Sequence, residues 1–173
     1  MTYGDTPGGG KKKAPEAVSD YKKPLPNPSL NPEVSKPFWD GTKKHELWVQ
    51  YDRRNNKFVF PPREVSPGDL TPMDELEWTK INGLGRVYSY TTVYQSSIPA
   101  FTEEAPYVNA TIQLDAAGVR MTGNVLGLTK EQLMNNELHI NQRVEAVFED
   151  ITDDWTLVKW QIIDEEEAPS AED

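Results

Sequence analysis

The sequence alternates apolar and polar residues over five separate stretches, and this period-two pattern constrains the fold more than any other feature. Stretches of this kind, rich in β-branched and aromatic residues and bounded by turn residues, are typical of half-buried strands. In the first stretch, one face is expected to carry Tyr88, Tyr90, Thr92 and Tyr94. In the third, Gly123 is expected to mark a bulge or a tight bend. The five stretches are GRVYSYTTVY, YVNATIQLD, GVRMTGNVLG, QRVEAVFED and DWTLVKWQII.

A short helix is expected between the third and fourth of these strands. In LTKEQLMNNEL, Thr129 and Gln132 have the spacing of a capping box. Five strands with one helix between the third and fourth form the outline of an OB-fold barrel. An immunoglobulin-type sandwich needs about seven strands and no such helix. The chain is therefore predicted to be mainly β, with a five-stranded OB-fold barrel over residues 80–163.

The stretch YDRRNNKFVFPPREVSPGD, residues 51–69, has the turns and spacing of a zinc ribbon with two metal-binding knuckles around a hairpin. The 173-residue chain contains no cysteine, however. This absence excludes disulfides, thiolate nucleophiles and cysteine-ligated zinc. Residues 47–79 are therefore predicted to form a degenerate, metal-free, rubredoxin-like or zinc-ribbon hairpin.

Both ends of the chain are poor in large apolar residues. Residues 1–31 are predicted to be a flexible arm, and residues 164–173 an acidic disordered tail, because neither can bury enough surface to offset its ordering entropy. Between the arm and the ribbon, residues 32–46 are predicted to contain a helix. Ser35 is expected to cap this helix and Pro37 to lie in its first turn.

Two aromatic residues of this helix, Phe38 and Trp39, are expected on one side together with Thr42. They either cover the core of their own domain or dock on a partner protein, since aromatic residues dominate interface anchors. The sequence leaves both interpretations open.

Several short motifs, in this order, resemble the acyl-CoA-associated proteins that pair a zinc ribbon with an OB-fold, known as domain-of-unknown-function family thirty-five. The resemblance covers residues 32–163. The motifs are PFWDG at 37–41, FPPR at 60–63, LEW at 76–78, GRVYSYTTV at 85–93, PYVNATIQLD at 106–115 and RVEAVFED at 143–150.

In that family two cysteine pairs flank the FPPR segment, and the resemblance places them here at Asp52, Asn55, Ser66 and Asp69. Oxygen ligands of this kind hold zinc poorly. The carboxylates and neutral oxygens could instead hold calcium or magnesium, or the knuckle turns could persist as Asx-turns without a metal. Without zinc, apolar packing is expected to stabilise the ribbon, at about 2 to 3 kcal/mol per large side chain. The residues expected to supply it are Trp48, Tyr51, Phe58, Phe60 and Trp78.

The resemblance implies an accessory subunit with no catalytic residue of its own. Such proteins associate with thiolase-fold subunits (thiolases, acyltransferases and retro-aldolases) or with hot-dog-fold hydratases, and they help to shape the acyl-CoA site. A required subunit of a hetero-oligomer is therefore expected, without a tightly bound cofactor, sharing a CoA thioester with its partner. Candidate CoA contacts are Arg53, Arg54, Lys57 and Arg63, because phosphates favour a basic spot; ordinary surface ion pairs are the alternative.

The remaining residues agree with a non-catalytic role. The chain has only two histidines, His45 and His139, and no Gly-x-Ser-x-Gly signature. Each histidine is expected to be a surface or hydrogen-bonded residue rather than a base. Four carboxylates lie at a predicted hairpin turn between the last two strands and are expected to form a solvated acidic tip; they are Glu149, Asp150, Asp153 and Asp154.

An alternative function is single-stranded nucleic-acid binding, in which Tyr88, Tyr90 and Tyr94 would stack on bases. The net charge of -10 weighs against this function, because it repels phosphate backbones. No apolar run approaches the ~18 residues that a membrane span needs, and the N-terminus does not have the pattern of an export signal. We therefore expect a cytoplasmic protein that binds neither nucleic acid nor membrane.

Overall fold

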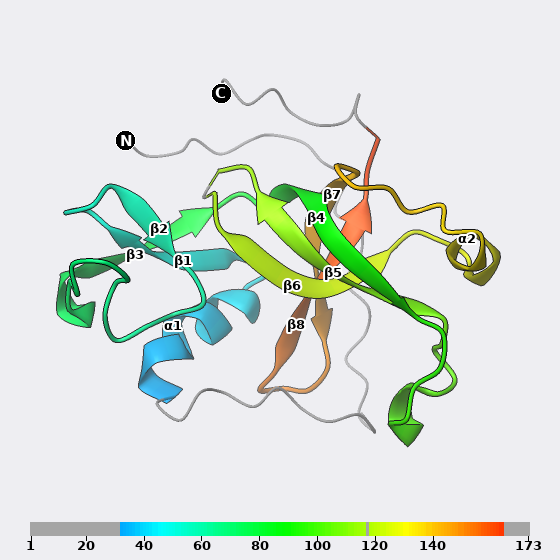
Figure 1. The fold of residues 1–173 in the computed structure, drawn as a ribbon. Coiled ribbons are helices and arrows are strands. Elements are labelled where there is room, and N and C mark those ends of the chain that lie inside the picture. Colours follow the sequence, from blue (N-terminus) through cyan, green and yellow to red (C-terminus); the bar gives the residue numbers. More distant parts are fainter. Residues whose placement is uncertain (1–31, 117, 165–173) are drawn as a thin grey trace.

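A computed structural model describes residues 32–116 and 118–164, in which a helix, a small sheet and a barrel follow one another along the chain (Figure 1). The predicted mainly β fold with a helix before it is confirmed. The predicted arm, residues 1–31, and residues 165–173 of the predicted tail lie outside the described residues. The elements are α1 (Pro32–Thr42), β1 (Leu47–Asp52), β2 (Lys57–Val59), η1 (Met73–Glu75), β3 (Leu76–Ile81), β4 (Leu84–Val93), η2 (Pro99–Phe101), β5 (Tyr107–Leu114), β6 (Arg120–Leu126), α2 (Lys130–Met134), β7 (Arg143–Asp150) and β8 (Thr156–Ile162).

Strands β4 to β8 form a closed barrel in the order β4-β5-β6-β8-β7. β4 pairs with β7 in antiparallel fashion, and β6 pairs with β8 in parallel fashion through Val125 and Leu126. α2 lies between the third and fourth barrel strands, as an OB-fold requires. It begins with the predicted capping box, because the Gln132 backbone N–H donates to Thr129 Oγ1 at 3.2 Å while the Thr129 N–H donates to Gln132 Oε1 at 2.9 Å. The predicted OB-fold is confirmed.

The centre of the barrel is filled by Trp160, which is 0% exposed. Gly123 pairs regularly with Ala110, and a Cβ atom at Gly123 would lie 2.8 Å from Trp160 Nε1. The expectation of a bulge or bend at Gly123 is therefore wrong: this glycine leaves room for the indole ring.

The bulge lies in β4 instead. Val87 pairs with Ile112 and Ser89 with Thr111, so that Tyr88 is the extra residue. Tyr88 points outward and is 49% exposed, whereas Tyr90 packs against the core. The prediction that both tyrosines share one face is wrong, because a bulge shifts the alternation by one residue.

The ribbon is a three-stranded sheet in the order β2-β1-β3 rather than a single hairpin. β3 runs antiparallel to β1 along its whole length, from Leu47 opposite Ile81 to Asp52 opposite Leu76. The strand continues to Ile81, past the predicted end of the ribbon at residue 79. Only β1 and β2 form the predicted hairpin.

Helix α1 begins before the expected cap, and Ser35 lies inside it with its hydroxyl donating to the Pro32 carbonyl at 3.3 Å. The helix contacts β1 and β8, and Figure 1 shows it between the ribbon and that part of the barrel. The side chains of Phe38 and Val49 belong to the same hydrophobic core as the barrel residue Ile112. Helix, ribbon and barrel therefore share one core.

A polar contact also joins the turn after α1 to the barrel. His45 Nε2 lies 3.1 Å from each carboxylate oxygen of Asp150, and its ring stacks on Phe148 with centroids 5.3 Å apart. Asp150 also accepts a hydrogen bond from Thr156 Oγ1 at 2.7 Å. Asp150 is thus a connecting residue, which corrects the expectation that it belongs to a solvated acidic tip.

Candidate functional site

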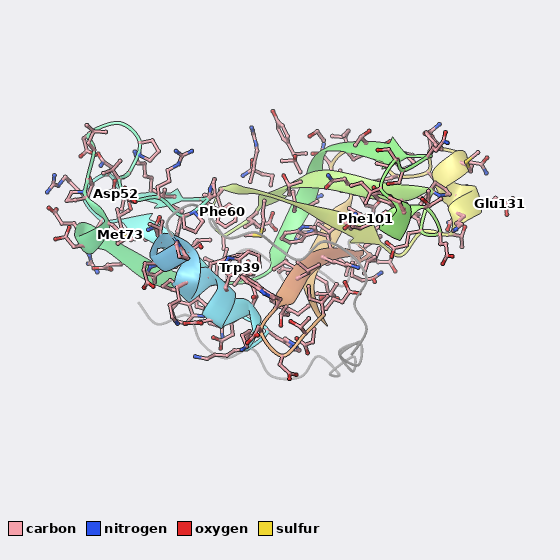
Figure 2. All side chains as sticks on the ribbon, turned by 90° about the horizontal axis from the view of Figure 1, so that it is seen from below. Trp39, Asp52, Phe60, Met73, Phe101 and Glu131 are labelled. Carbon is pink, nitrogen blue, oxygen red and sulfur yellow. The ribbon has the colours of Figure 1, made fainter. Side chains whose placement is uncertain are left out.

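The four positions at which the resemblance places metal ligands converge at the end of the ribbon. Asp52 ends β1, Asn55 lies in the β1–β2 turn, and Ser66 and Asp69 lie in the loop before η1. Asp52 and Met73 lie at one end of the molecule, and Glu131 of the α2 helix at the other (Figure 2). The convergence that the resemblance implies is therefore present without any cysteine.

Hydrogen bonds connect these side chains through Thr71, a residue that the sequence analysis missed. The Asn55 backbone N–H donates to Asp52 Oδ1 at 3.0 Å, and Asn55 Nδ2 donates to Asp52 Oδ2 at 2.8 Å and to Thr71 Oγ1 at 3.3 Å. Thr71 Oγ1 donates to Asp69 Oδ1 at 2.9 Å, and the Ser66 N–H donates to the Thr71 carbonyl at 2.8 Å. We call these five residues the knuckle network. The bonds from Asn55 to Asp52 and from the Thr71 N–H to Asp69 are of the expected Asx type.

The knuckle network favours the ionised form of its carboxylates. Burial acts to raise the pKa of Asp52, but the Ser66, Asn55 and Thr71 groups around it outweigh burial and lower the pKa to about 2. The pKa of Asp69 is also lowered, chiefly by the Asn55 and Thr71 side chains. Ser66 Oγ is buried and makes no well-aligned hydrogen bond among the described residues.

The network does not fit a metal ion in this arrangement. Zinc sites in proteins are built from cysteine, histidine and carboxylate groups, whereas an amide group of Asn55 lies between Asp52 and Thr71 here. The amide must present its NH2 group to the Asp52 carboxylate, which can only accept, and an NH2 group repels a cation. The same argument disfavours calcium or magnesium. We therefore assign no chemical role to a metal ion at the knuckle network.

The expectation that aromatic packing compensates for zinc is incomplete. The rings of Tyr51 and Phe58 pack at 5.0 Å within the ribbon, and those of Phe60 and Phe38 at 5.5 Å toward the barrel. The ligand positions themselves, however, are joined by polar groups. A buried hydrogen-bonded carboxylate, and not only apolar area, holds the two knuckles together.

We expect acid to weaken the ribbon in a defined pH window. A carboxyl group whose pKa is lower in the folded chain stabilises the fold fully above its unfolded value of 3.8, and this stabilisation is lost as the pH falls toward about 2. Within this window the unfolded state binds more protons, so stability rises with pH. Urea unfolding followed by tryptophan fluorescence at several pH values from about 5 to about 2 should show this loss, and the slope should be smaller for Asp52→Asn. Asp153→Asn, in the exposed β7–β8 turn, is the control; equal slopes in all three proteins would contradict the assignment.

A second feature is a cleft of about 380 Å³ between the ribbon and the barrel. Its charged lining residues are Lys57 and Arg63 from the ribbon and Arg120 from β6, and no carboxylate residue of the described part of the chain lines it. Phe58 and Phe60 form its apolar part. Cations around a partly apolar cavity suit the phosphate groups of an organic ligand.

The four predicted CoA contacts divide into two pairs. Arg53 forms a bidentate ion pair with Glu77, at 2.9 and 2.7 Å, and Arg54 pairs with Glu75. These two arginines are the surface ion pairs that the sequence analysis left as the alternative. Lys57, which also donates to the Pro67 carbonyl, and Arg63 remain candidate contacts because they line the cleft.

Arg120 completes the cleft and was missed by the sequence analysis. Its guanidinium carbon lies 3.5 Å from the centre of the Tyr88 ring, and its Nε donates to Gln113 Oε1 at 3.0 Å. These contacts hold the side chain in place before any ligand binds. No local pattern could reveal the site, because β3, β4 and β5 separate Arg120 from Lys57 and Arg63 in the sequence.

The tyrosines of β4 do not form a single stacking platform. One face of the Tyr88 ring is occupied by Arg120, and the Tyr90 hydroxyl donates to the Leu138 carbonyl at 2.7 Å. Tyr94 donates to Asn136 Oδ1 at 3.0 Å. The alternative of single-stranded nucleic-acid binding therefore loses the geometry on which it depended.

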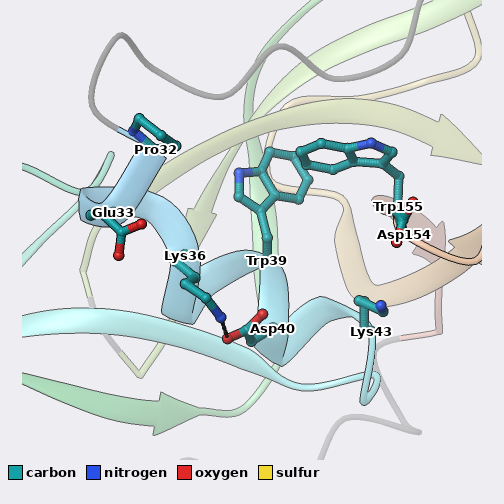
Figure 3. Close-up of a pocket in the computed structure, with 8 residues that line it drawn as sticks. All are labelled: Pro32, Glu33, Lys36, Trp39, Asp40, Lys43, Asp154 and Trp155. Atoms are coloured by element: carbon teal, nitrogen blue, oxygen red, sulfur yellow. Dashed lines mark hydrogen bonds and ion pairs between the residues drawn. The ribbon is translucent and has the colours of Figure 1, made fainter.

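The two aromatic residues of α1 have different environments. Phe38 is only 7% exposed and packs on Phe60, so the docking interpretation is corrected for this residue. Trp39 lines a pocket of about 260 Å³ and meets Trp155 edge to face, with centroids 5.1 Å apart (Figure 3). Its role in docking stays a prediction. Among the described residues, no helix has the length and apolarity to cross a bilayer.

The helix, the ribbon and the closed five-stranded barrel define an OB-fold protein with a small three-stranded sheet in front of the barrel. Residues 78–149 match the family described as "ChsH2, C-terminal OB-fold domain". A DUF35 domain-containing scaffold protein of Methanocaldococcus jannaschii is 37% identical over 95 residues, which cover 55% of this chain and 62% of the relative. The resemblance to family thirty-five is thereby confirmed.

Two further relatives extend the comparison. The 3-oxo-4,17-pregnadiene-20-carboxyl-CoA hydratase alpha subunit of Mycobacterium tuberculosis is 28% identical over 139 residues, covering 79% of this chain and 41% of the relative. The chain thus spans 41% to 62% of these two relatives. Among solved structures, a chain of the "Ltp2-ChsH2(DUF35) aldolase" matches with a TM-score of 0.65 and 23% identity, covering 79% of this chain and 98% of that one. This last likeness concerns the fold.

Proposed function

We propose that this chain is a non-catalytic accessory subunit of a cytoplasmic enzyme that acts on acyl-CoA thioesters. The observation that carries the proposal is its likeness to relatives named as scaffold proteins and as a subunit of a CoA-thioester hydratase. The solved structure with the same fold comes from an aldolase complex. An accessory role also agrees with the cleft between ribbon and barrel, which carries cations rather than a nucleophile and a base.

The proposed partner is a thiolase-fold subunit, which supplies the catalytic residues. In this arrangement Lys57, Arg63 and Arg120 contact the phosphates of the CoA thioester, while its acyl end reaches into the partner. Trp39, beside the pocket of α1, is the proposed docking residue. The chain therefore contributes binding energy and position, not a reacting group.

The test is coexpression of this chain with a thiolase-fold protein of the same organism. We expect the two chains to elute together on size exclusion and the large chain alone to be inactive. Trp39→Ala is expected to weaken the complex, because an aromatic anchor contributes about 2 kcal/mol or more to an interface. Lys57→Glu with Arg63→Glu should leave the complex intact but raise KM for the CoA substrate. Separate elution together with full activity of the large chain alone would refute the proposal.

A further inference from the structure

Four residues form a row across the outside of the barrel, starting where the described chain ends. The Ile163 backbone N–H donates to the Arg143 carbonyl at 3.1 Å. Arg143 lies opposite Arg86, Arg86 opposite Gln113, and Gln113 opposite Arg120. Directly paired residues point to the same face of a sheet. We call this row, which contains three arginines, the arginine row.

The arginine row faces outward, because the residues next to it in the sequence face the core. Val87, Val144, Ile112 and Met121 are all buried. Arg143 is largely covered and pairs with Asp115, while Arg86 donates to the Asn141 carbonyl at 3.1 Å. At its far end, Arg120 is also a wall of the cleft between ribbon and barrel. Because the charge of Arg143 is buried and paired with Asp115, Arg86 and Arg120 are the positively charged groups of the row between residue 163 and the cleft.

The residues that follow Asp164 have the opposite charge. Residues 165–173 read EEEAPSAED, with five carboxylates and no cation. Three strand spacings of about 4.8 Å separate Arg143 from Arg120, or about 15 Å. Nine residues in extended form span up to about 30 Å. The acidic segment is therefore long enough to follow the arginine row into the cleft.

We propose that residues 165–173 occupy the arginine row and the cleft, where their carboxylates compete with the phosphates of an anionic ligand. The identity of that ligand, a CoA thioester, rests on the proposed function. The binding of residues 165–173 to the arginine row does not depend on it. Residues 32–164 carry more acidic than basic residues and as a whole repel the segment, whereas the row and the cleft attract it. A tethered segment has an effective concentration of about 1 mM, so even a weak contact suffices.

The proposal is tested with coenzyme A as the probe and the full chain throughout. Calorimetry at low salt compares the triple variant Glu165→Gln, Glu166→Gln, Glu167→Gln with the unchanged chain. If the tethered segment binds its site with a Kd of about 0.1 mM, the triple variant is expected to bind coenzyme A about tenfold more tightly. Arg86→Gln, on the row but outside the cleft, should give a similar gain, and combining the two changes should add little. Asp153→Asn with Asp154→Asn, in the exposed β7–β8 turn, is the matched control without effect. Equal affinities in all these proteins would overturn the inference and leave the proposed function intact.

A second measurement does not depend on coenzyme A. A fluorescent peptide with the sequence of residues 164–173 is expected to bind the Glu165→Gln, Glu166→Gln, Glu167→Gln chain, and its binding should weaken with salt and in Arg86→Gln and Arg120→Gln. If the peptide binds in this way while coenzyme A does not bind, the inference stands and the CoA role fails. Peptide binding that depends on Lys11, Lys12 and Lys13 instead of the arginine row would overturn the inference.

Discussion

Simultaneous replacement of Asp52, Asn55, Ser66 and Asp69 by cysteine is expected to convert the ribbon into a zinc-binding unit. The four side chains already meet at the end of the ribbon, linked by bonds such as that of 2.8 Å from Asn55 Nδ2 to Asp52 Oδ2. Four thiolates form a tetrahedral zinc site. Structural zinc sites of this kind have apparent binding free energies of about 10 kcal/mol or more, which corresponds to dissociation constants well below about 1 μM.

The measurement is a competition titration with cobalt and zinc, followed by the zinc content of the purified chain. We expect one zinc ion per chain in the fourfold variant and none in the unchanged chain. Asp52→Cys with Asn55→Cys is the matched control, because two thiolates leave the tetrahedron incomplete. A fourfold variant with an unchanged circular dichroism spectrum but no affinity for zinc would show that the positions do not converge as described.

Replacement of Trp160 by alanine is expected to destabilise the chain by about 4 kcal/mol. The side chain is 0% exposed and lies against Gly123, so its removal leaves a large cavity within the barrel. Deletions of buried tryptophan or phenylalanine side chains cost about 3 to 5 kcal/mol. With an m-value of about 2 kcal/mol/M in urea, the unfolding midpoint should fall by about 2 M.

Trp155→Ala serves as the comparison for this prediction. Trp155 is half-buried at the pocket of α1 and meets Trp39 edge to face. Its removal leaves an open surface instead of a closed cavity, so we expect a loss of about 1 kcal/mol. A midpoint for Trp160→Ala that equals that of Trp155→Ala would contradict the central position of Trp160.

The fold was predictable from the sequence wherever a local pattern decides the structure. The alternation of β5, which buries Val108, Ala110 and Ile112, identifies a strand from its residue types alone. The capping box of Thr129 and Gln132 likewise depends on residues three positions apart. OB-fold topology then follows from the order of the elements, because few arrangements close five strands around one core.

The site was less predictable, because its residues meet only through the tertiary structure. Arg120 reaches the cleft from β6, a barrel strand that is separated from the ribbon by two other strands in the sequence. Thr71 lies just outside the spacing that identifies the knuckles, although it links Asn55 to Asp69. The bulge at Tyr88 arises from the pairing with β5 and has no glycine to mark it.

The backbone hydrogen bonds within the two sheets also limit where a strand of another protein can pair with this chain. Each strand of the barrel has a neighbour on both sides, because the order β4-β5-β6-β8-β7 returns to its start. Addition of a foreign strand needs an outer strand with unpaired N–H and C=O groups. Within residues 32–116 and 118–164, the strands that lie at the edge of a sheet along their whole length are β2 and β3 of the ribbon. Main-chain pairing along a whole strand is therefore possible at the ribbon, whereas in the barrel only parts of β4, β6, β7 and β8 lack a second neighbour.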